Sequence, residues 1–207
     1  MNTTALQDPN LQLQLQAGYF ARRTWSDWLF AALLVVGGLY AFMTYEHAMD
    51  GYERGILLAA IPTFIWLGWL WRPLQVLMGV VAALSLLALW LYQGDLGRAE
   101  SVFLLKYFLS SQSAILWMSV LIFLATLFYW GGALWPSQRS SWQAIGSKLT
   151  WVAVTLALVG TMVRWWEGHQ MGPDIGHIPV SNLYEVFVLF CWMTALFYLY
   201  YEAQYKT

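Results

Sequence analysis

The chain has 207 residues, of which 60% are hydrophobic and 10% are charged, and its formal net charge is -1. Soluble domains carry about 25% charged residues. This composition excludes an ordinary soluble domain, because too few charges are present to cover a water-facing surface. The small net charge excludes a general electrostatic attraction to nucleic acid. A single cysteine, Cys191, excludes an internal disulfide framework and every motif that needs a cysteine pair.

Residues 1–24 are predicted to form a polar N-terminal tail. Their sequence has no apolar core followed by a small-residue cleavage site, so it does not match a cleavable signal peptide.

Residues 25–203 are predicted to form a membrane-embedded bundle. Six apolar runs follow one another there, and each approaches the roughly 20 residues that a helix needs to cross about 30 Å of hydrocarbon. A strand exposed to lipid would leave backbone groups unpaired, so the runs are predicted to be helices. The expected spans are 28–45, 55–71, 74–92, 114–135, 149–166 and 183–201. The predicted fold class is therefore all-α, a polytopic integral membrane helix bundle.

The basic residues predict a cytoplasmic N-terminus. In that orientation more of the lysines and arginines lie on the cytoplasmic side, as the positive-inside rule requires. His47, His169 and His177 then all lie on the outer side. The apolar segment 101–110 also lies outside and is too short to span. It is predicted to be an interfacial helix, with Lys106 reaching the lipid headgroups.

The motifs of several other activities are absent from the sequence. No charged residue lies at the middle of an expected span, which disfavours a proton pump or an ion channel. No glycine-rich phosphate loop, His-Glu-x-x-His zinc motif or Gly-x-Ser-x-Gly nucleophile motif is present. We therefore predict no resident metal site and assign no catalytic residue.

Residues 164–182 are predicted to form a shaped outer loop that leads into the last span. The residues expected to interrupt a helix there are Gly168, Gly172, Pro173, Gly176 and Pro179. Asn182 is expected to cap the last helix, with Glu185 reaching back to complete a capping box. On pattern alone the segment is a well-capped helix start with two solvated histidines.

Three segments near the last span resemble the CcsA/ResC family of system II cytochrome c biogenesis proteins, whose proteobacterial members are often labelled CcsB. They are Arg164-Trp165, Gly176-His-Ile-Pro-Val-Ser-Asn-Leu-Tyr-Glu185 and Phe190-Cys-Trp192. The motif residues that match are Arg164, Trp165, Gly176, His177, Pro179, Ser181, Asn182, Tyr184 and Glu185. The five earlier spans agree with the family in number and character.

The resemblance implies a bacterial inner-membrane subunit that helps to deliver haem and to attach it to apocytochrome c. It implies haem as the cofactor, and apocytochrome c and a ResB-type membrane protein as partners within the lipid bilayer. The family acts as a cytochrome c synthase, or haem lyase, in complex with that partner, and we expect this chain alone to be inactive. His177 is the candidate for a residue close to haem. Structural support of the loop is the favoured role for His177 and for the other motif residues.

The sequence departs from the family in one respect. It contains no Trp-Gly-x-x-Trp-x-Trp-Asp segment, which in the family carries the outer tryptophans beside the haem-ligating histidines. We therefore expect the chain to be the N-terminal portion of a longer protein. Most of its 14 tryptophans are expected to be interfacial anchors rather than a haem-stacking surface. Two alternatives stay open: half of a membrane transporter, and a structural membrane anchor without its own chemistry.

Overall fold

The computed structural model of the chain describes residues 20–47, 49, 51–172, 176 and 178–205. Most of the predicted tail over 1–24 therefore lies outside the described residues. The chain divides into two compact units, Met1–Val76 and Leu77–Thr207, and each is taken by itself below.

Six helices in the described part of the chain are long and apolar enough to cross a membrane. No strand occurs among the residues that the structure describes, so the prediction of an all-α membrane bundle is confirmed, while the orientation of the N-terminus stays a prediction. The six helices are α2 (Trp25–Tyr45), α3 (Gly51–Leu70), α4 (Arg72–Tyr92), α6 (Ser111–Leu134), α7 (Arg139–Met171) and α8 (Leu183–Tyr205).

Helix α7 differs most from its expected span of 149–166, because it has 33 residues and continues to Met171. Hydropathy shows where a helix is apolar, but a helix continues beyond its apolar part until a residue interrupts it. The first eight residues of the predicted outer loop, 164–171, are therefore helical. The prediction that Gly168 interrupts the helix is wrong, because the helix continues through this glycine and ends only before Gly172. A short 3-10 turn, η3 (Pro136–Gln138), joins α6 to α7.

Two short helical segments connect α4 to α6 in place of the continuous interfacial helix expected over 101–110. They are α5 (Arg98–Ser101) and the π-helical turn η2 (Leu105–Leu109). Leu105 and Leu109 are buried, whereas Phe103 and Tyr107 are 66% and 49% exposed. The segment is therefore amphipathic, which agrees with a location at the membrane surface.

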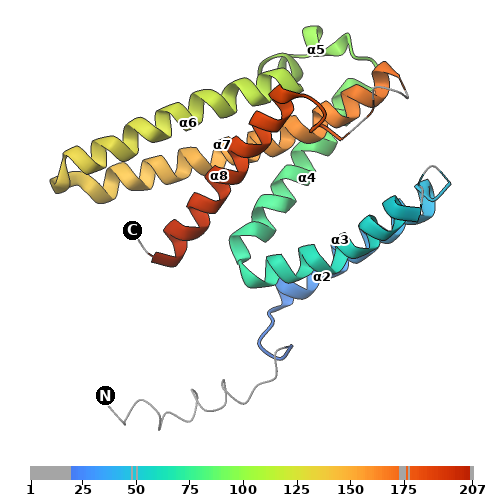
Figure 1. Cartoon of the computed structure of the whole chain (residues 1–207), viewed down its shortest axis with the longest axis horizontal. Helices are drawn as coiled ribbons and strands as arrows, with labels where there is room; N and C mark the ends of the chain where they lie inside the picture. The colour runs from blue at the N-terminus through green and yellow to red at the C-terminus, as the bar shows by residue number, and fades with distance from the viewer. Residues whose placement is uncertain (1–19, 48, 50, 173–175, 177, 206–207) are drawn as a thin grey trace. The chain divides into compact units, whose positions relative to one another are not determined.

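In the first unit, α2 and α3 lie side by side (Figure 1), and Asp27 of α2 is the centre of their polar contacts. Its side chain is fully buried. Its Oδ2 accepts hydrogen bonds from the Thr24 backbone N–H at 2.9 Å and from Arg72 Nη2 at 3.1 Å. Its Oδ1 accepts from Gln75 Nε2 at 2.8 Å, and its backbone carbonyl accepts from Trp69 Nε1 at 3.0 Å. One carboxylate thus joins the starts of α2 and α4 to the end of α3.

In the second unit, α6 and α7 lie side by side along their lengths, and α8 packs against α7 (Figure 1). Small residues allow the close approach of α6 and α7. At Gly160, a Cβ atom would lie 2.9 Å from Ile115 Cγ1 and 3.3 Å from the Ser111 carbonyl oxygen. Ile115, Met118, Ala157 and Val188 form a buried apolar cluster that joins the three helices.

We expect Asp27→Ala to destabilise the first unit by about 1–3 kcal/mol, because it leaves the donors of Gln75, Arg72 and Thr24 without their acceptor. Unfolding of the purified chain in detergent micelles, followed by circular dichroism, measures the loss. Ser26→Ala is the matched control, since Ser26 is exposed and lies one residue away. Equal stability of the Asp27→Ala variant and the wild type would show that the network contributes nothing.

Candidate functional site

The motif residues singled out from the sequence lie at the end of α7 and at the start of α8. Arg164 of α7 forms an ion pair with Glu185 of α8, with 3.7 Å between Nε and Oε1. The Glu185 side chain is 9% exposed, whereas that of Arg164 is 36% exposed. The pair therefore joins a nearly buried carboxylate to a cation that still reaches the surface.

Glu185 also organises the start of α8. The Asn182 side-chain oxygen accepts a hydrogen bond from the Glu185 backbone N–H at 2.9 Å, so the predicted cap is present. Glu185 Oε2 accepts from the backbone N–H and from the hydroxyl of Ser181, both at 3.1 Å. The expected capping box differs by one position, because the carboxylate bonds Ser181 rather than the backbone of Asn182.

A second contact holds the motif segment against α7. Gly176 lies on the imidazole of His169, where a Cβ atom would be 2.6 Å from Cδ2. His169 Nδ1 is 2.9 Å from the backbone carbonyl oxygen of Trp165, and the two rings lie 6.2 Å apart. A side chain at position 176 would displace this ring, which explains the fit of glycine there.

The other motif residues do not join the Glu185 cluster. Pro179 is buried, whereas Tyr184 is 55% exposed. His177, the residue expected to lie close to haem, falls outside the described residues. Among the described residues, no group of three or more His, Cys, Asp or Glu side chains could hold a metal ion.

The sequence analysis missed another buried carboxylate of the second unit, Glu167, which lies one turn beyond Arg164 on α7. Glu167 is 7% exposed. Its Oε1 accepts hydrogen bonds from the Tyr92 hydroxyl at 2.6 Å and from the Ser111 backbone N–H at 3.2 Å. Its Oε2 accepts from the Ser111 hydroxyl at 2.5 Å. Glu167 therefore binds the end of α4 and the start of α6. At the start of α6 an anion also interacts favourably with the helix dipole.

A polar pocket of about 510 Å³ lies beside this carboxylate. Its lining combines two cations, two carboxylates and several hydroxyl and amide groups. The lining residues are Tyr92, Leu96, Gly97, Ala99, Glu100, Lys106, Ser110, Ser111, Gln112, Ser113, Arg164, Glu167 and Met171. Because Arg164 also pairs with Glu185, the motif cluster and this pocket share one residue.

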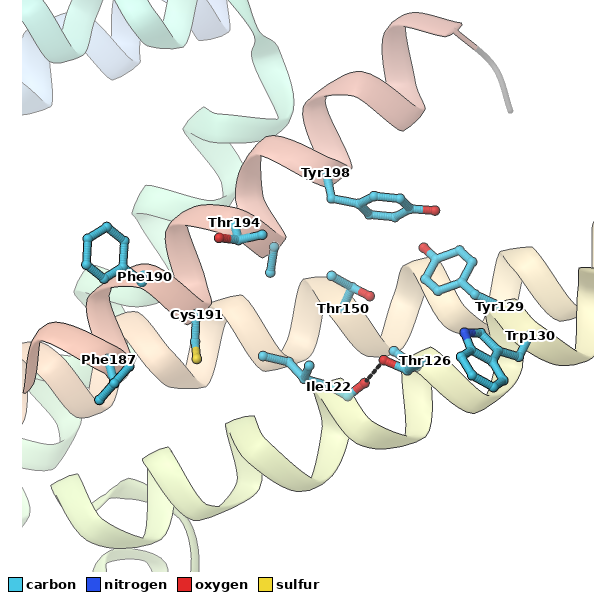
Figure 2. A pocket seen from close by; sticks show the side chains of 12 residues that line it. Ile122, Thr126, Tyr129, Trp130, Thr150, Phe187, Phe190, Cys191, Thr194 and Tyr198 are labelled. Carbon is cyan, nitrogen blue, oxygen red and sulfur yellow. Dashed lines mark hydrogen bonds between the residues drawn. The ribbon is translucent and has the colours of Figure 1, made fainter. Parts of the chain in front are cut away.

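An apolar groove of about 560 Å³ lies elsewhere in the same unit, between α6 and α8 over α7 (Figure 2). Tyr129 of α6 and Tyr198 of α8 point toward each other at one end of it, with ring centroids 5.1 Å apart. Cys191 and Phe187 of α8 lie toward its other end. The groove is lined by neutral residues, so it offers apolar contacts and no ionic recognition.

One signal in the sequence could have revealed Glu167. Arg164 and Glu167 are three residues apart, so they occupy the same face of a helix, and both follow a long apolar run. Two charged residues on one helix face at the end of an apolar run indicate that this face contacts other polar groups. Tyr92 carried no comparable signal, because an aromatic residue at a span end is ordinarily an interfacial anchor.

We expect Asn182→Ala to destabilise the start of α8 by about 1 kcal/mol, because the Glu185 N–H loses its acceptor. Thermal unfolding in detergent measures the effect. Asn182→Ser supplies a side-chain oxygen at the same position and should lose much less. If alanine and serine gave the same stability as the wild type, the cap would make no contribution.

No protein-family profile and no solved structure matches the chain. Among curated proteins it is similar to the cytochrome c biogenesis protein CcsA of Chlorella vulgaris, with 31% identity over 93 residues. The match covers 42% of this chain and 25% of that protein, so it spans a quarter of the relative's length. The chain is therefore an integral membrane protein of six candidate spans that is CcsA-like over the matched segment.

Proposed function

We propose that the chain is a membrane subunit of the machinery that delivers haem and attaches it to apocytochrome c. The observation that carries this proposal is the similarity to a protein named for cytochrome c biogenesis. The six apolar helices support it, because such a subunit must be embedded in the bilayer. The motif residues around Glu185 support it too, since they are the residues through which the sequence resembles the CcsA/ResC family.

The motif's structural role in this function is to hold the corner between α7 and α8. Arg164, Ser181 and Asn182 all converge on Glu185. Removing Glu185 would leave the Arg164 cation without its partner and the backbone N–H and hydroxyl of Ser181 without their acceptor. Catalysis of haem attachment is largely a matter of positioning, so a rigid corner next to the outer loop is the contribution that this cluster makes.

The residues at the end of α7 fit the donor type that haem iron requires, which is most often a neutral imidazole. The His169 ring is exposed, and its Nδ1 faces the Trp165 carbonyl. Donation of the Nδ1 proton to that carbonyl leaves Nε2 as the nitrogen able to bind a metal. Among the described residues, His169 is the histidine that would hold haem here. When bound, haem supplies the vinyl groups that react with two thiols of apocytochrome c.

The proposed function also implies a membrane location, an orientation and a partner for the chain. The bundle lies in the bacterial inner membrane with its histidine-bearing loops on the periplasmic side, where apocytochrome c arrives. A ResB-type membrane protein is its partner, and the synthase activity belongs to their complex.

Deletion of the gene from its host bacterium tests this function. We expect the deletion to abolish covalently attached haem on c-type cytochromes, because the delivery and attachment machinery lacks a subunit. Haem staining of denaturing gels measures that attachment, and spectra of b-type cytochromes show that haem synthesis continues. Reintroduction of the wild-type gene should restore the stain.

Two variants separate the motif from the rest of the chain. Glu185→Ala should restore less haem attachment than the wild type at equal membrane abundance. Glu46→Ala should restore it fully, because Glu46 bonds Arg54 through a backbone carbonyl that the substitution keeps. Normal c-type cytochromes in the deletion strain would overturn the proposal.

A further inference from the structure

The polar pocket beside η2 has the composition of a lipid-headgroup site. We propose that it binds the headgroup of a zwitterionic phospholipid, with the phosphodiester on Lys106 and Arg164 and a primary ammonium group facing Glu100. This inference concerns the pocket lined by these three residues and does not depend on the proposed role in cytochrome c assembly.

The location of the pocket suits a headgroup. Its lining includes Tyr92 at the end of α4, residues 110–113 at the start of α6, and three residues at the end of α7, which are Arg164, Glu167 and Met171. These helices are candidate membrane spans, and the hydrocarbon core is only about 30 Å thick. The ends of spans therefore lie at the depth of the headgroups, where the phosphates are found.

Two cations in the pocket have capacity for an anion. Lys106 is exposed, and its ammonium group lies 5.7 Å from the Tyr107 ring centroid without an ion pair to any described residue. Arg164 uses Nε toward Glu185, at 3.7 Å. Within the described part of the chain, its two terminal nitrogens make no hydrogen bond. A guanidinium and an ammonium group that approach from different segments fit a phosphodiester oxygen pair.

The two carboxylates in the pocket lining, Glu100 and Glu167, determine which kind of anion can bind there. Glu167 has its oxygens occupied by Tyr92 and Ser111, so it adds negative charge to the wall without offering free acceptors. Glu100 is exposed and forms no ion pair with another described residue. Two negative charges beside two positive ones disfavour a dianion such as free phosphate. They favour a headgroup that brings one phosphate and one ammonium group that donates hydrogen bonds.

The surroundings of Lys106 suit the rest of a lipid molecule. Phe103, Tyr107 and Phe108 are 66%, 49% and 39% exposed, and all belong to the segment around η2. The Phe108 ring stacks on Trp117 of α6 with 5.9 Å between centroids. Exposed aromatic rings of this kind settle at the membrane interface, and a lysine among them keeps its charge at the headgroups.

Native mass spectrometry of the full chain tests the proposal. The chain is released from nanodiscs that contain equal amounts of phosphatidylethanolamine, phosphatidylglycerol and phosphatidylcholine. We expect phosphatidylethanolamine to be the lipid retained, because phosphatidylcholine has no N–H donor and phosphatidylglycerol has no cation. Inorganic phosphate added at excess should leave the bound lipid in place, which distinguishes a lipid headgroup from a free phosphate site.

The variants identify the pocket. Lys106→Gln and Arg164→Gln should each weaken lipid retention about tenfold, the loss expected for one charged hydrogen bond. Lys148→Gln, an exposed lysine of α7 outside the pocket, should change nothing. Glu100→Gln should remove the preference for phosphatidylethanolamine over phosphatidylglycerol. Because Lys106 is exposed and unpaired, its variant keeps the fold even where that of Arg164 fails.

Three outcomes would overturn the proposal. They are equal retention of the three lipids by the wild type, displacement of the lipid by inorganic phosphate, and unchanged retention by the Lys106→Gln variant. Circular dichroism of each variant confirms that a loss of lipid is not a loss of helix.

Discussion

The second unit depends on one buried carboxylate, Glu167, which hydrogen-bonds the end of α4 and the start of α6. The spans themselves are apolar, and apolar contacts are non-directional, so they constrain the sliding of one helix along another less than hydrogen bonds do. Hydrogen bonds are directional, and those of Glu167 join the last turns of α7 to the end of α4 and the start of α6. Glu202 has the same role at the other end of the bundle, where it accepts hydrogen bonds from Tyr129 and Ser147.

This arrangement explains why the candidate site and the headgroup pocket lie together. Arg164, Glu167 and His169 follow one another in the last turns of α7, which extends beyond the apolar span. Arg164 bonds forward to Glu185 of α8, and Glu167 bonds back to α4 and α6. One helix end therefore carries both the motif corner proposed to serve haem attachment and the pocket proposed to hold a lipid.

Local sequence signals predicted the local features. Long apolar runs predicted the six helices because burial in lipid depends on composition along one segment. Asn182 predicted its own cap, since a cap involves neighbours in the chain. The bonds of Glu167 were not predictable in this way. Tyr92 and Ser111 are 75 and 56 residues away in sequence, and no periodicity shows which helix faces will meet. Asp27 and Gln75, 48 residues apart, escaped for the same reason.

Hydrogen–deuterium exchange of the Ser111 amide tests most directly whether Glu167 fixes the start of α6. In Glu167→Ala this N–H loses its acceptor, so the account predicts faster exchange at the start of α6 than in the wild type. The Glu202→Ala variant removes the carboxylate at the opposite end of the bundle. In that variant, exchange at the start of α6 should stay at the wild-type rate. Equal protection of Ser111 in Glu167→Ala and in the wild type would contradict the account.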